Sequence, residues 1–208
     1  MIDAIAAACG RSVSRETFYR LERYVDLLLA ANQEQNLIGR SSIPEVWTRH
    51  ILDSAQLIRF APVEGRWLDI GSGAGLPGLV IAILADANMC LVEPRRLRAE
   101  FLQKCVEQLG LSKVEVVCGK VETLTGEFDV ATARAVASID KLFLLAARLT
   151  HSGTVWILPK GRSAAKELAE AKASWQGRFH MEPSLTAGDA VIVVAEGVTP
   201  KGTTRGVG

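Results

Sequence analysis

Apolar residues recur at helical spacing in the N-terminal part of the chain. Between residues 14 and 32 they follow one another every three or four positions: Phe18, Leu21, Val25 and Leu28. Ser14 precedes this stripe and is a residue type that caps helix N-termini. Ser42 and Glu45 have capping-box spacing ahead of a second apolar stripe at 46–58. The pattern predicts a helical N-terminal extension over residues 1–60.

From residue 66 onward, short apolar runs alternate with amphipathic segments. The runs predict strands at 66–70, 89–93, 114–118, 128–133 and 154–158, and the segments predict helices at 76–85, 96–109, 139–149 and 163–174. Such alternation is typical of a parallel sheet with helices on both faces. Two last runs, at 178–182 and 190–195, have no helix between them and predict an antiparallel pair at the sheet edge.

These elements predict an α/β domain of Rossmann-like architecture. We expect about seven strands, mostly parallel, with an antiparallel edge strand, as in doubly wound folds. The core would span residues 61–196, the N-terminal extension would pack on it, and residues 197–208 would form a flexible tail.

The composition excludes several classes of protein. The chain has 208 residues, of which 49% are hydrophobic, which suits one domain with a sizeable core. The 24 basic and 23 acidic residues create no global positive field, so any RNA contact must come from local patches. Asp3 and the lack of a basic segment argue against a signal peptide, and no apolar run reaches the length of a membrane span. We expect a cytoplasmic protein without membrane contact.

The cysteines do not predict a metal centre. Cys9, Cys90, Cys105 and Cys118 form no C-x-x-C pair and have no histidine cluster beside them. Structural zinc sites need four closely spaced ligands, and iron–sulfur clusters need several cysteines close together. We therefore expect no metal.

A glycine-rich turn follows the first predicted strand. Asp69, Gly71, Gly73 and Gly75 fit D-x-G-x-G-x-G, the first motif of S-adenosylmethionine (SAM) methyltransferases. Glycine allows positive φ and close approach of a ligand to the backbone. Glu93 ends the next strand about 20 residues later, where an acid can reach ribose hydroxyls. Read from Gly73 to Gly78, the same turn also fits the dinucleotide pattern G-x-G-x-x-G, so NAD remains an alternative.

Four strings of residues extend this motif into a family resemblance. They occur in order along the chain: Asn36-Leu37-Ile38, Arg49-His50-Ile51-Leu52-Asp53-Ser54, the loop from Asp69 to Gly78, and Phe128-Asp129-Val130-Ala131-Thr132-Ala133-Arg134-Ala135. Together they resemble the bacterial small-subunit rRNA guanine-N7 methyltransferases, also called glucose-inhibited division protein B, over roughly residues 14–195. The resemblance implies the class I SAM-dependent methyltransferase fold, SAM as the methyl donor, and a guanine in the 530 loop of 16S rRNA as the acceptor.

The resemblance also implies which residues contact the cofactor. Besides Asp69, the three glycines and Glu93 of the motif reading, these are Leu76, Val121, Glu122 and Arg134. Two strings depart from the family pattern. Lys120-Val121-Glu122 often begins with Arg in the family, and Ala133-Arg134-Ala135-Val136-Ala137 often carries Phe at position 136. Both departures keep the charged residues.

Methylation of guanine N7 needs little catalytic equipment. N7 has an in-plane lone pair and no proton, so its attack requires positioning but no general base. No residue is assigned a certain catalytic role, and Arg134 and His50 are the candidates. For His50, which shares a helix face with Val46 and Trp47, an architectural or substrate-shaping role is the stronger interpretation.

Four basic residues at the expected ligand edge of the sheet are candidates for RNA phosphate binding: Arg95, Arg96, Lys160 and Arg162. The expected partner is 16S rRNA, within the small ribosomal subunit or an assembly intermediate, and the enzyme is expected to be a monomer. Alternatives on the same fold are a small-molecule or protein methyltransferase, a NAD-dependent oxidoreductase, and a non-catalytic SAM- or RNA-binding module.

Overall fold

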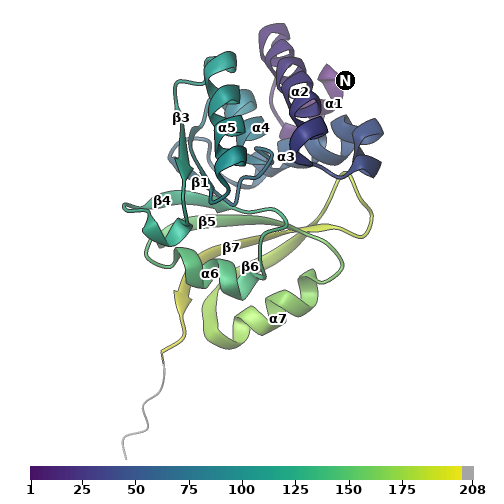
Figure 1. Ribbon diagram of the computed structural model, residues 1–208. Helices are drawn as coiled ribbons and strands as arrows, with labels where there is room; N and C mark the ends of the chain where they lie inside the picture. The colour runs from purple at the N-terminus through teal and green to yellow at the C-terminus, as the bar shows by residue number, and fades with distance from the viewer. Residues whose placement is uncertain (203–208) are drawn as a thin grey trace, which may run out of the picture.

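A seven-stranded sheet forms the centre of the computed structural model, which describes residues 1–202 (Figure 1). Its strands are β1 (Arg66–Ile70), β2 (Asn88–Glu93), β3 (Val114–Cys118), β4 (Phe128–Thr132), β5 (Thr150–Lys160), β6 (Trp175–Pro183) and β7 (Val191–Pro200). They lie in the order β3-β2-β1-β4-β5-β7-β6. Strands β1 to β5 pair in parallel, and β7 runs antiparallel to both β5 and β6. The predicted fold class is therefore confirmed.

Helices cover both faces of this sheet. They are α4 (Gly78–Ala85), α5 (Arg96–Leu109), α6 (Ile139–Ala146) and α7 (Ala164–Ser174), with a short turn η4 (Val121–Thr123) after β3. Alternate residues of a strand face opposite sides, so Trp67 of β1 joins the core under α4 and α5. Leu68 joins the second core under α6 and α7. The two helical layers lie above and below the sheet in Figure 1.

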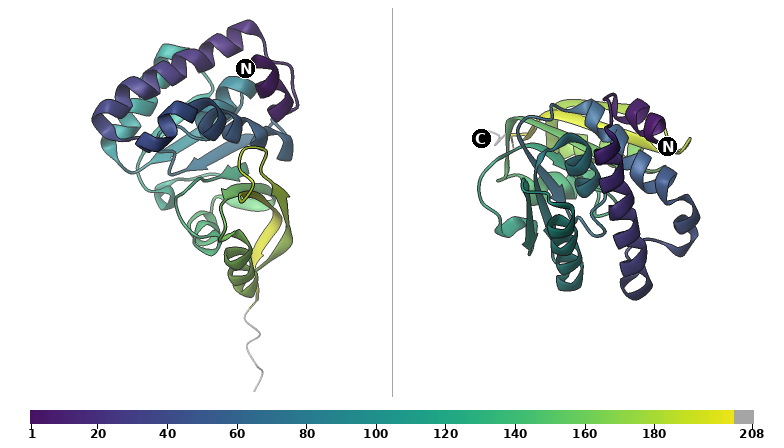
Figure 2. Two further views of the ribbon diagram at one scale, coloured as in Figure 1. Left: turned by 90° about the vertical axis from the view of Figure 1, so that its right-hand side faces the viewer. Right: turned by 90° about the horizontal axis from the view of Figure 1, so that it is seen from above.

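The N-terminal extension packs on the layer that contains α4 and α5 (Figure 2). It consists of α1 (Ile2–Cys9), α2 (Arg15–Gln35), η1 (Arg40–Glu45), η2 (Trp47–Leu52), α3 (Asp53–Ala55) and η3 (Gln56–Phe60). The hydroxyl of Ser14 accepts the Thr17 N–H, as expected for the cap of α2. Leu21 and Leu28 are fully buried and belong to the same core as the sheet residues. No helix within residues 1–202 is both long and apolar enough to cross a membrane.

The predicted capping box at 42–45 is wrong. The chain there forms a 3₁₀ turn that leads into the π-helical turn η2, without a side-chain cap. Pro44 has no N–H to donate, and the Ser42 hydroxyl donates instead to the Gly39 carbonyl. The Ser42 side chain therefore does not cap a helix; its hydroxyl lies within hydrogen-bond distance of His50.

The last strand extends past the predicted core boundary at residue 196. Strand β7 continues to Pro200, because its last residues pair with the start of β6: Thr199 with Gln176 and Pro200 with Trp175. Trp175 is buried, so this end of the hairpin belongs to the core. Residues 203–208 of the predicted tail lie outside the described residues.

Candidate cofactor and acceptor site

The loop between β1 and α4 needs glycine for its conformation. Gly71, Gly73 and Gly75 all have positive φ, at 68°, 56° and 87°. A Cβ on Gly71 would lie 2.7 Å from a methyl carbon of Val136, and a Cβ on Gly75 would collide with Leu79. The loop therefore packs directly against the segment that follows β4 and against its own helix.

Asp69 closes this loop from behind. The side chain is fully buried, and its Oδ2 accepts the Gly78 N–H at 3.2 Å, next to the start of α4. Burial raises the pKa of Asp69 to about 7, against the hydrogen bond from Gly78 and the charge of Arg134, which lower it. Asp69 thus shapes the loop from beneath and does not line the cavity above it.

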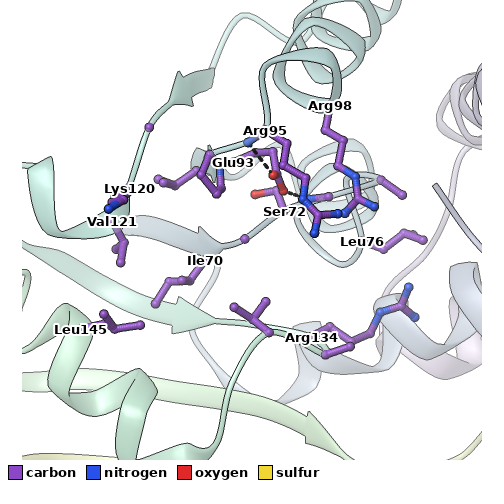
Figure 3. A pocket seen from close by; sticks show the side chains of 18 of the residues that line it. Ile70, Ser72, Leu76, Glu93, Arg95, Arg98, Lys120, Val121, Arg134 and Leu145 are labelled. Carbon is purple, nitrogen blue, oxygen red and sulfur yellow. Dashed lines mark hydrogen bonds between the residues drawn. The ribbon is translucent and has the colours of Figure 1, made fainter. Parts of the chain in front are cut away.

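Glu93 ties the end of β2 to the same loop. Its Oε2 accepts the Gly73 N–H and its Oε1 accepts the Arg95 N–H, both at 2.9 Å (Figure 3). Each carboxylate oxygen can accept more than one hydrogen bond, so the group can still receive hydroxyl donors from a ligand. The sequence position of Glu93 and its fixed orientation both suit a ribose diol.

A cavity of about 600 Å³ opens above these residues, within the usual range for a ligand site. All predicted cofactor residues line it except Asp69 and Gly75: Gly71, Gly73, Leu76, Glu93, Val121, Glu122 and Arg134. Its walls join the carboxyl ends of β1, β2 and β4, where ligands bind in open α/β sheets. The position, the close-approach glycines and the buried acid fit SAM, whose nucleoside and amino-acid halves need no phosphate cradle.

A second cavity of about 490 Å³ adjoins the first. The two share a wall made of Arg134, Ala135 and Val136. Ala135 has a φ of 57°, which is unusual for a residue with a Cβ and marks a sharply turned segment. The second cavity extends from this wall to the ends of β5 and β7. The two cavities therefore lie next to each other, on either side of residues 134–136.

Sequence comparison decides the family. The profile of the family described as rRNA small subunit methyltransferase G matches residues 18–189. The chain belongs to this family. A relative named ribosomal RNA small subunit methyltransferase G, from Rhizorhabdus wittichii, is 47% identical over 195 residues, which cover 91% of this chain and 90% of the relative. The protein is accordingly a SAM-dependent rRNA methyltransferase.

Solved structures with little sequence similarity share the fold. A mutant of MtNAS in complex with S-adenosylmethionine aligns with a TM-score of 0.56 and 21% identity, over 86% of this chain and 75% of that one. The glycopeptide N-methyltransferase MtfA, in complex with S-adenosyl-L-homocysteine, aligns with a TM-score of 0.56 and 12% identity, over 66% and 85%. These similarities agree with the class I methyltransferase architecture.

Arg134 connects the shared wall to the N-terminal extension. Its Nη1 donates to Asp53 Oδ2 at 3.3 Å and to the Arg49 carbonyl at 3.4 Å, and its Nη2 lies 3.2 Å from His50 Nδ1. In Figure 3 the Arg134 side chain extends away from Val121 and Leu145, on the opposite side of the cavity. The structure thus brings the two predicted catalytic candidates, Arg134 and His50, into direct contact.

The four predicted RNA contacts occupy three different settings. Arg95 lines the first cavity, which is the candidate cofactor cavity. Arg96 and Arg162 are exposed, and they pair with Glu100 and Asp189. The Lys160 side chain is only 10% exposed, and its Nζ donates to Glu167 and to the Ala137 carbonyl. The Lys160 ammonium therefore braces the segment after β4, a role that leaves it poorly placed for phosphate.

Several residues of the site were not singled out from the sequence. The cofactor cavity is also lined by Leu37, Arg98, Val136 and Lys141, and Tyr24 binds the glycine loop. Leu37 and Val136 lie in strings that carry the family resemblance, so both had a sequence signal. Within residues 1–202 no group of three or more His, Cys, Asp or Glu side chains is arranged to hold a metal ion.

Proposed function

We propose that the protein methylates N7 of a guanine in the 530 loop of 16S rRNA. The observation that carries this proposal is that the titratable side chains near residues 134–136 are poorly suited to accept a proton. Burial, and then the charge of Arg134, lower the pKa of His50 to about 4. Asp53 and Glu167, which line the second cavity, are paired with Arg134 and Lys160. An acceptor that must lose a proton has no suitable base among these side chains, whereas guanine N7 needs none.

The residues of the first cavity would hold the cofactor. The glycine loop lets the backbone approach the amino-acid half, Glu93 would accept from the ribose, and Val121 and Glu122 would border the adenine. When bound, SAM supplies an electrophilic methyl group on a sulfonium. The protein aligns the two reactants and excludes water, which is sufficient for an in-line displacement.

The second cavity is the place we assign to the acceptor base. It combines apolar surface from Val136, Pro159 and Ile192, which suits the faces of a purine, with polar groups from Asp53 and Ser184. It touches the cofactor cavity only across the wall at 134–136. A base within it would therefore meet the cofactor from the side of β4 and β5.

Arginines at the cofactor cavity would bind the RNA backbone. Arg95 and Arg98 both line the cavity, where they project over it in Figure 3. SAM carries a net positive charge, and its one carboxylate can pair with only one of these arginines. The remaining positive charge at the cavity favours the binding of a polyanion such as RNA. We propose that Arg95, with Arg96 and Arg162 farther out, contacts phosphates of 16S rRNA within the small subunit or an assembly intermediate. In this proposal the enzyme acts as a monomer in the cytoplasm.

The test is methyl transfer from labelled SAM to small ribosomal subunits that lack the modification. We expect label in 16S rRNA, and chain cleavage at one guanosine after borohydride and aniline treatment, which is specific for the N7-methylated base. The Gly73→Asp variant is the matched inactive control. Label in protein, in a small molecule or at another atom of the base would overturn the proposal and favour the alternative acceptors.

A further inference from the structure

His50 lies at the centre of a hydrogen-bonded chain that crosses from the wall of the two cavities to the N-terminal extension. On one side its Nδ1 is 3.2 Å from Arg134 Nη2. On the other side its Nε2 is 2.8 Å from the Ser42 hydroxyl, which donates to the Gly39 carbonyl at 2.7 Å. Gly39 closely follows Leu37, which lines the cofactor cavity.

The donors in this chain fix the tautomer of the imidazole. A guanidinium has only N–H donors, so His50 Nδ1 must be the acceptor and carries no proton. The Ser42 hydroxyl already gives its hydrogen to Gly39, so His50 Nε2 must donate to the serine oxygen. Every polar atom in the chain is then matched, with a neutral His50 protonated on Nε2.

The charged groups that face His50 keep it in this neutral form. Arg134 from the end of β4 and Arg49 from the same turn both disfavour a second proton, and burial acts in the same direction. Asp53, one turn on, opposes them. The balance lowers the pKa of His50 to about 4, so the acceptor lone pair on Nδ1 persists through the neutral range.

We propose that His50 is a positioning residue for Arg134. Its neutral imidazole accepts a hydrogen bond from the guanidinium, and together with Asp53 it holds Arg134 in the wall where the cofactor and acceptor cavities meet. The role in methyl transfer rests on the function proposed above, while the hydrogen-bonded arrangement does not. Displacement of a reactant by about 1 Å can cost on the order of a hundredfold in rate. A group that fixes this wall therefore affects alignment without taking a proton.

The first arm of the test needs no substrate. The chain has three histidines, so long-range ¹H–¹⁵N spectra of histidine-labelled protein resolve each ring, and the His50→Gln variant assigns His50. We expect His50 to be protonated on Nε2 only, down to about pH 5. In Arg134→Ala the pKa of His50 should rise, since Arg134 lowers it. An Nδ1-protonated ring, or a doubly protonated one at pH 6, would overturn the proposal even if the enzyme methylates 16S rRNA.

The second arm compares two amide variants in single-turnover methylation. In His50→Asn the side-chain amide oxygen can take the place of Nδ1 and accept from Arg134, whereas the longer side chain of His50→Gln reaches the position of Nε2 near Ser42. We expect His50→Gln to lose about tenfold in rate and His50→Asn to lose about threefold or less. The wild-type rate should show no limb near pH 6.5, the unperturbed histidine pKa.

The pattern of losses separates the possible roles. Equal losses in both variants would mean that His50 only fills space, and the proposal would fail. A loss of about a hundredfold or more in both variants, with a limb near pH 6.5, would mean that His50 acts as a general base. Absence of methylation by the wild-type enzyme would refute the proposed function instead, and the spectra of the first arm would still decide the arrangement.

Discussion

The hydroxyl of Tyr24 donates a hydrogen bond of 2.7 Å to the carbonyl of Ala74. Tyr24 lies in the middle of α2, and Ala74 lies in the glycine loop of the cofactor cavity. Both residues are buried. The N-terminal extension therefore supports the candidate cofactor site, because it holds the loop where we propose that the backbone approaches the ligand.

Replacement of Tyr24 by Phe should weaken both the fold and cofactor binding. The Ala74 carbonyl would stay buried without its partner, and a buried unsatisfied group costs about 1–3 kcal/mol. We expect a loss of that size in the free energy of unfolding, measured by urea denaturation, and a severalfold weaker affinity for SAM by calorimetry. Tyr19→Phe is the control, because Tyr19 lies on the same helix and is 61% exposed. Equal effects of the two variants would contradict a role for the Ala74 contact.

The periodicity of the chain was sufficient to predict the sheet but not the partners of its side chains. Strand β1, for example, has the bounds 66–70 that its apolar run predicts. Tyr24 has the spacing of an ordinary core residue, and its long-range hydrogen bond to residue 74 leaves no trace in local sequence. Periodicity reports which face is buried, and only the folded chain shows what that face contacts.

Local propensity also failed where tertiary contacts control the backbone. The segment from 40 to 60 has a helical stripe, yet it folds as successive 3₁₀, π and α turns. Asp53 and Gln56 in this segment bind the loop between β6 and β7, through Thr186 and Ser184. Lys160 is a second case. Its place at the end of a strand predicts a phosphate contact, but its ammonium is paired with Glu167, a partly buried residue of the next helix.

Substitution of Gly73 tests the cofactor site. A Cβ at Gly73 would have room, with its nearest neighbours at 3.6 Å or more, although the φ of 56° strains a residue that is not glycine. Longer side chains would enter the cavity that Gly73 lines. We expect Gly73→Asp to abolish SAM binding in calorimetry while the circular dichroism spectrum stays native.

Gly161→Ala is the matched control, since a Cβ there meets nothing within 4 Å and the residue lies only in the second cavity. Its SAM affinity should equal that of the wild type. If Gly73→Asp bound SAM with wild-type affinity, the assignment of the cofactor site to the glycine loop would be wrong. Substitution of Gly75 is not an equivalent test, because its Cβ would collide with Leu79 and threaten the fold itself.

Two double substitutions of arginine test the RNA contacts, because each removes two positive charges but from a different part of the surface. Arg95 and Arg98 line the cofactor cavity, whereas Arg96 and Arg162 are exposed and paired with acids. We expect Arg95→Ala/Arg98→Ala to weaken RNA binding about tenfold and to lower the slope of log K against log salt by about 1–2, since each lost phosphate contact accounts for about one unit. The Arg96→Ala/Arg162→Ala variant should change both quantities less.

Filter binding at several salt concentrations measures these slopes, and calorimetry should show little change in SAM affinity. If the two double variants weaken RNA binding equally, only net charge matters and the cavity arginines have no special contact. If the slope is unchanged in Arg95→Ala/Arg98→Ala, these residues do not touch phosphate.

Asp69 should make the stability of the protein depend on pH in an identifiable way. Burial raises the pKa of Asp69 to about 7 in the folded state, whereas an unfolded aspartate titrates near 3.9. Between these values the folded protein holds a proton that the unfolded chain releases. The stabilisation from this proton is complete below about pH 4 and is lost as the pH rises through about 7.

The Asp69→Asn variant isolates this contribution, because its amide can still accept from Gly78 but does not titrate. The free energy of unfolding of the wild type minus that of Asp69→Asn should therefore fall by roughly 3–4 kcal/mol from pH 4 to pH 8, because each pKa unit corresponds to about 1.4 kcal/mol. Urea denaturation of both proteins across this range measures the difference, in which all other titrating groups cancel. A difference that is constant with pH would mean that Asp69 is ionised in the folded protein throughout this range. That result would contradict the prediction, because the buried Oδ1 has no hydrogen-bond partner among the described residues that could stabilise the charge.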